Sequence, residues 1–96
     1  MAYDPTKDEM DAQRSTAISS QARTAVAVTP SDTVDLTTYA KALYVGSAGD
    51  LAILPVNNTD GNPVTLANHP VGYCPIQVRR VYSTGTIASG IVALVD

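Results

Sequence analysis

The sequence predicts an all-β fold, a small antiparallel β-sandwich or barrel of about six short strands behind an extended N-terminal arm. From residue 25 onward, Val, Ile, Thr and Tyr dominate, and Gly, Pro, Asn and Asp punctuate the chain at short intervals. The chain has 96 residues, enough for one domain, and it contains neither Trp nor Phe. We therefore expect an arm over residues 1–24 and a β domain over residues 25–96.

The arm is polar and holds nearly half of the charged residues of the chain. Asp4 and Pro5 suit the N-cap and the first position of a short helix, which could extend through Met10, Ala17 and Ile18. Its apolar content is too thin for a core, so we expect it to become ordered only against a partner, with an ordinary frayed terminus as the alternative. The arm residues that we expect to bind the partner are Met10, Arg14, Ile18 and Arg23.

The expected strands cover residues 24–29, 40–45, 51–56, 63–67, 76–82 and 86–95, and turns, including one at residues 70–72, separate them. Asp60 and Gly61 form the strongest hairpin signal, since Gly tolerates the positive φ of such turns. Pro55 indicates a strand at a sheet edge, because proline cannot donate to a ladder. Gly90 interrupts the last strand and indicates a bulge or a close backbone approach.

A β body of this size, with no disulfide and no metal, lies near the lower limit of independent stability. The chain also ends in the apolar run 91–95, which would aggregate if it stayed exposed and unpaired. Both features favour a permanent homo-oligomer. The residues that we expect at its interface are Tyr44, Tyr82, Ile91 and Leu94.

Composition argues against several functions. The net charge of -3 disfavours nucleic-acid binding, and no apolar stretch is long enough to span a membrane. The single Cys74 and the single His69 exclude a disulfide framework and a His-rich metal site, so we expect no cofactor. We interpret Cys74 as a buried apolar residue and His69 as a loop residue, not as a catalytic pair. The chain is thus expected not to be an enzyme.

Four aspartates lie in predicted turns, where local backbone hydrogen bonds explain them better than paired catalytic carboxylates do. They are Asp32, Asp35, Asp50 and Asp60. Arg79 and Arg80 form the only basic pair. They could meet an acidic surface of a partner, or one of them could extend outward from a strand edge.

Three segments carry a resemblance to a known family: Ser31-Asp-Thr-Val-Asp-Leu36, the run 42–50 (ALYVGSAGD), and the run 76–94 (IQVRRVYSTGTIASGIVAL). Together they resemble the head spike base proteins of tailed bacteriophages and gene transfer agents. The resemblance covers roughly residues 28–95, and the last segment is its more specific half. The chain departs from the family pattern at Lys41, where Arg is common, in a longer hairpin at residues 55–63, and in its polar arm.

The resemblance implies a non-enzymatic virion protein, made in the cytoplasm of the host bacterium, on the outer surface of the capsid. Its implied partners are the major capsid protein and a spike or fibre protein. A tail or baseplate adaptor is the first alternative. A module that binds host carbohydrate is the second, although sugar platforms usually use Trp or Phe.

Overall fold

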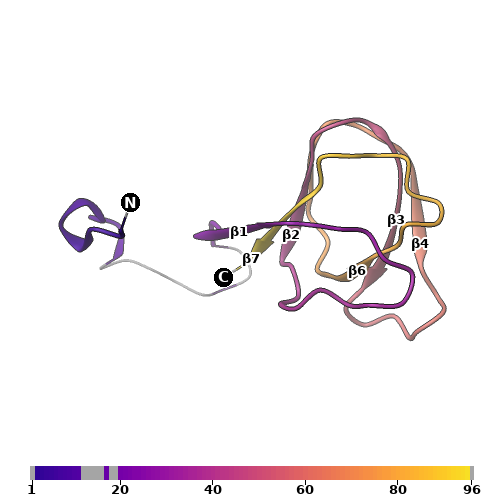
Figure 1. The fold of residues 1–96 in the computed structure, drawn as a ribbon, viewed down its shortest axis with the longest axis horizontal. Coiled ribbons are helices and arrows are strands. Elements are labelled where there is room, and N and C mark those ends of the chain that lie inside the picture. Colours follow the sequence, from indigo (N-terminus) through magenta and orange to yellow (C-terminus); the bar gives the residue numbers. More distant parts are fainter. Residues whose placement is uncertain (1, 12–16, 18–19, 96) are drawn as a thin grey trace.

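A computed structural model describes residues 2–11, 17 and 20–95 of the chain. The described residues form one short 3-10 helix and seven strands: η1 (Pro5–Lys7), β1 (Thr24–Ala27), β2 (Ala42–Val45), β3 (Gly49–Pro55), β4 (Val64–His69), β5 (Gly72–Cys74), β6 (Val78–Val81) and β7 (Val92–Val95). One sheet has the order β1-β7-β2-β5 and the other the order β4-β3-β6, and all pairs are antiparallel (Figure 1). The expected all-β sandwich is confirmed.

The core lies between the two sheets and contains only small and medium apolar side chains. Leu43 and Val45 alternate with exposed or half-buried neighbours along β2, and Ala93 and Val95 do the same along β7. From the opposite sheet, β3 contributes a continuous buried run over residues 51–54. The continuous buried run means that both faces of β3 are covered, whereas the alternation in β2 and β7 leaves one face of their sheet uncovered.

Three local expectations about the strands were wrong. The strand expected over residues 86–95 is present only as Val92–Val95. Residues 70–72 were expected to form a turn, but Gly72 begins β5, which pairs with β2. Pro55 was expected to place its strand at an edge, but β3 lies between β4 and β6. Pro55 is the last residue of β3, and the pairing register shifts between Leu54 and Pro55. The missing N–H therefore falls at an irregularity, where proline is tolerated.

The hairpin turn expected at Gly61 and the close backbone approach expected at Gly90 are both present. The Asp60–Gly61 segment joins β3 and β4 in an antiparallel hairpin, and Gly61 has a φ of 83°. Gly90 has a φ of 65°, and a Cβ there would lie 3.3 Å from the Cα of Gly46. The Gly46 N–H donates to the carbonyls of both Ser89 and Gly90, at 3.1 and 3.2 Å. Gly90 thus marks a close approach of two backbones.

The described part of the arm contains the short helix that Asp4 and Pro5 predict. The Asp4 carboxylate accepts from the Thr6 N–H at 2.9 Å, and Pro5 begins η1. The helix ends at Lys7, well before the Met10–Ile18 stretch through which it could have continued. Figure 1 shows η1 at one end of the long axis, apart from the sandwich; the Cα extents are 44 × 26 × 22 Å.

Candidate functional site

The strand residues on the outward face of the four-stranded sheet are alanine, valine, leucine and tyrosine, with no charged side chain among them. Cross-strand register places Tyr44 opposite both Tyr73 and Val92, and Leu94 opposite both Ala42 and Ala25. These side chains alternate with the inward ones of the core, so they share the other face of the sheet. We call this surface the outer apolar face; it consists of Ala25, Ala27, Ala42, Tyr44, Tyr73, Val92 and Leu94.

Two tyrosines lie side by side on this face. Tyr73 is 71% exposed and Tyr44 is 37% exposed. Their rings meet edge to face, with centroids 5.6 Å apart and planes at 68°. An antiparallel sheet with one solvated face usually has polar side chains on that face. An outward face without charged side chains is therefore a candidate interaction surface.

The arm enters the body beside the outer apolar face. A shallow depression at this border is lined by Ser20, Gln21, Ala22, Lys41, Ala42, Tyr73 and Leu94. Lys41 Nζ donates to the Ala17 carbonyl at 3.4 Å, which holds the arm close to the beginning of β2. A partner on the outer apolar face would therefore also contact the last residues of the arm.

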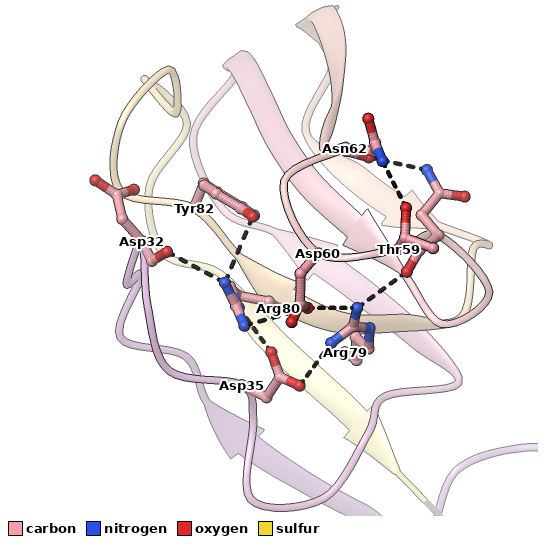
Figure 2. A network of polar contacts seen from close by, with 9 residues as sticks. Asp32, Asp35, Thr59, Asp60, Asn62, Arg79, Arg80 and Tyr82 are labelled. Carbon is pink, nitrogen blue, oxygen red and sulfur yellow. Dashed lines mark hydrogen bonds and ion pairs between the residues drawn. The ribbon is translucent and has the colours of Figure 1, made fainter.

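A second feature is polar: an arginine–aspartate network lies at the end of the sandwich near β6 (Figure 2). Arg79 donates to Asp35 Oδ2 at 2.9 Å and to Asp60 Oδ1 at 2.7 Å. Arg80 Nε donates to Asp35 Oδ1 at 2.6 Å, and its guanidinium lies 5.5 Å from the ring centroid of Tyr82. The network joins the loop before β2, strand β6 and the β3–β4 hairpin.

The electrostatics of this network agree with its geometry. The hydrogen bond from Arg80 is the largest factor that lowers the pKa of Asp35, and Arg79 lowers it further. The side chains of Arg79 and Arg80 are only 14% and 11% exposed. Their donors face carboxylates of the same chain, so the network holds three segments of the body together.

The turn aspartates bond to distant segments, contrary to the expectation of local hydrogen bonds. Asp32 accepts from the N–H and the Oγ1 of Thr84, at 2.9 and 2.6 Å. Asp50 was expected in a turn but lies in β3, and it accepts from the N–H of Asn68 in β4 at 2.9 Å. The donors to Asp35 and Asp60 lie on β6, so these carboxylates bond to a strand that is distant in the sequence. Sequence alone carries no signal for such pairs.

The residues expected at interfaces have different surroundings. Tyr44 and Leu94 lie together on the outer apolar face, whereas Ile91 belongs to the buried core. Arg23 forms ion pairs with Asp8 and Asp11 within the arm. Met10 is exposed in the arm, and Arg14 and Ile18 lie outside the described residues. Tyr73 was not among the expected interface residues, because a short strand between two turns has no clear periodicity.

The remaining reactive side chains form no catalytic arrangement within the described residues. Cys74 is buried, and burial raises the pKa of its thiol, which disfavours the nucleophilic thiolate. The His69 ring Nδ1 lies 2.7 Å from the Pro70 carbonyl oxygen. In the described ranges, His, Cys, Asp and Glu side chains do not gather in groups of three or more that could hold a metal ion. No helix in the described part of the chain has the length and apolarity needed to cross a membrane.

No protein-family profile matches the sequence. No curated protein matches it. Among solved structures, the chain is similar to one in the capsid of a native GTA (gene transfer agent) particle computed with C5 symmetry. The two chains are 29% identical, and the alignment has a TM-score of 0.77 and covers 91% of this chain and 98% of that chain. The likeness thus spans nearly the whole of both chains.

Proposed function

We propose that this chain is a structural virion protein, a head spike base or decoration protein that docks on the outer surface of a capsid and anchors a spike or fibre. The main support is the likeness to a chain of a native GTA capsid over 91% of this chain. The three segments that resemble head spike base proteins support the finer role. Since both lines point to a structural part of a particle, we propose no enzymatic activity.

The outer apolar face supplies the surface for self-association in this proposal. It carries Tyr44 and Leu94, which the sequence indicates as interface residues, together with the more exposed Tyr73. Burial of these side chains between copies removes apolar surface from water. A face of four short strands is small beside a standard interface, so each contact is weak and the assembly depends on several contacts at once.

The arm supplies the contact with the capsid. Its short helix, η1, lies at one end of the long axis, apart from the sandwich, and its polar groups are therefore free to meet another chain (Figure 1). Its ordering on a capsid surface would add contact area to a small body. The major capsid protein is the proposed partner of the arm. A spike or fibre protein is the proposed partner of the side of the assembly that faces away from the capsid.

Binding to purified capsids that lack this protein tests the proposal. The full chain should sediment with the capsids, and electron cryomicroscopy should show it on their outer surface. A chain from which residues 1–22 are deleted retains every strand and should stay folded but fail to sediment. Density on the tail or baseplate would establish the adaptor alternative instead, and absence from particles together with binding to a glycan array would establish the carbohydrate alternative.

A further inference from the structure

Strand β1 is an open edge that nothing within the described residues covers. It pairs with β7 along one side and is the end strand of its sheet. All four of its residues are exposed, including Val26 at 53%. Native edge strands are usually protected by a charge, a proline or a bulge. The segment 24–29 (TAVAVT) contains no charged residue and no proline, and its register with β7 shows no bulge.

The hydrogen-bond pattern shows which backbone groups face the open edge. The Val28 N–H donates to the Ile91 carbonyl at 3.0 Å, which continues the register of β1 on β7. Bonded and non-bonded pairs alternate in an antiparallel ladder, so Val26 also bonds to β7. The N–H and C=O groups of Ala25 and Ala27 therefore point away from β7, toward solvent.

We propose that β1 pairs antiparallel with β1 of a second copy, with Val26 opposite Val26 of that copy. In this register, Ala25 of each copy faces Ala27 of the other, and both pairs exchange the backbone hydrogen bonds that the open edge leaves free. This pairing supplies a two-fold contact for the self-association in the proposed function. It rests on the proposed function only for that role.

Self-complementarity is the reason to choose a second copy as the occupant. The segment Ala25-Val26-Ala27 reads the same in both directions, so a two-fold axis at Val26 brings identical small residues together. Thr24 then faces Val28, and the charged Arg23 falls beyond the short paired segment. No like charges meet along the pairing.

Both faces of the joined sheet gain from this arrangement. Ala25 and Ala27 belong to the outer apolar face, and opposite residues of an antiparallel pair share a face, so the two outer apolar faces become continuous. On the inner side, Val26 borders a groove whose lining includes Val28, Val34, Leu36 and Ala93. The two Val26 side chains form a non-bonded pair, the closer kind of cross-strand contact, and shield each other from water.

The association state of the purified full chain, measured by light scattering over a range of concentrations without capsids, tests the pairing. The wild type should pass from monomer to dimer. Ala27→Pro removes an N–H that faces only the open edge and should give a monomer with an unchanged thermal midpoint. Ala25→Lys/Ala27→Lys places like charges across the axis and should weaken association by about tenfold or more.

A charge swap tests the register and covers the case in which the proline variant fails to fold. Ala25→Lys/Ala27→Glu places opposite charges across the axis and should associate more strongly than the double lysine variant. Thr65→Lys/Ala67→Lys, two exposed positions of edge strand β4, should associate like the wild type. A wild type that stays monomeric, an oligomer that survives Ala27→Pro, or a charge swap no stronger than the double lysine variant would overturn the proposal. Because capsids are absent, none of these outcomes bears on capsid docking.

Discussion

Arg80 and Asp35 lie 45 residues apart in sequence, yet Arg80 Nε donates to Asp35 Oδ1 at 2.6 Å. The second oxygen of the same carboxylate accepts from Arg79 Nη1 at 2.9 Å. One aspartate thus fastens the loop before β2 to two adjacent residues of β6. Arg79 extends the connection to the β3–β4 hairpin through the Asn58 carbonyl and the Asp60 carboxylate. In a core without large aromatic residues, this network supplements apolar packing at one end of the sandwich.

Replacement of Asp35 should destabilise the fold more than replacement of Asp60. Asp35→Asn leaves two largely buried guanidinium groups without their shared carboxylate, whereas Asp60 is 76% exposed and solvent readily replaces it. We expect the thermal midpoint of Asp35→Asn to fall by about 5 °C or more and that of Asp60→Asn to fall less. Equal midpoints for the two variants in circular dichroism melts would contradict this role for Asp35.

The same network predicts loss of stability in acid. Hydrogen bonds from Arg80 and Thr84 lower the pKa values of Asp35 and Asp32, respectively, in the folded chain. A carboxyl with a lowered folded pKa stabilises the fold above its unfolded pKa, and this contribution disappears as the pH falls through the folded value. Stability should therefore be level above about pH 5 and decline below about pH 4. Urea titrations across this range should show a smaller decline for Asp35→Asn, and an equal decline would exclude Asp35 as a source.

Gly90→Ala should destabilise the chain more than Gly61→Ala, although both glycines have a positive φ. A Cβ at Gly90 would lie 3.3 Å from the Gly46 Cα, whereas a Cβ at Gly61 meets nothing within 4 Å. The left-handed backbone alone costs about 1 kcal/mol in either variant, and backbone displacement raises the cost at Gly90 to about 2–3 kcal/mol. Denaturant unfolding measures both values. An equal decrease in the free energy of unfolding for the two variants would show that the close approach to Gly46 does not affect stability.

Local patterns account for the features that the sequence predicts well. The alternation in 42–45 depends on neighbours two residues apart, and the Asp60–Gly61 turn depends on the φ that glycine allows, so both are visible in a short window. The N-cap at Asp4 is equally local. These features predict the sandwich class, the hairpin and the short helix without knowledge of which strands pair.

Features that depend on distant segments escaped prediction for a physical reason. Strand β5 is defined by its pairing with β2, in which Tyr73 lies opposite Tyr44. A segment of three residues has no sequence pattern that predicts this pairing. Pro55 suggested an edge strand because no local pattern shows the register irregularity that accommodates this proline. That irregularity forms only where β3 pairs with Val78 of β6. The partners of Arg79 were likewise invisible, since Asp35 and Asp60 come from separate loops. Tyr44 and Leu94 were expected at an interface, but only the register shows that they share one apolar face.

Tyr73 should contribute to association and little to folding. Its ring is 71% exposed and meets Tyr44 edge to face, so Tyr73→Ser removes apolar surface from the outer apolar face and leaves the core intact. We expect the free energy of unfolding to change by about 1 kcal/mol or less and capsid binding to weaken by about tenfold or more, while pairing through β1 is unchanged because Tyr73 lies on β5 at the opposite edge of the sheet. Tyr39→Ser is the matched control, because Tyr39 is 49% exposed and lies outside this face. Sedimentation of both variants, alone and with capsids, measures the effect. Equal weakening by the two substitutions, or none by Tyr73→Ser, would show that the outer apolar face is not the interface.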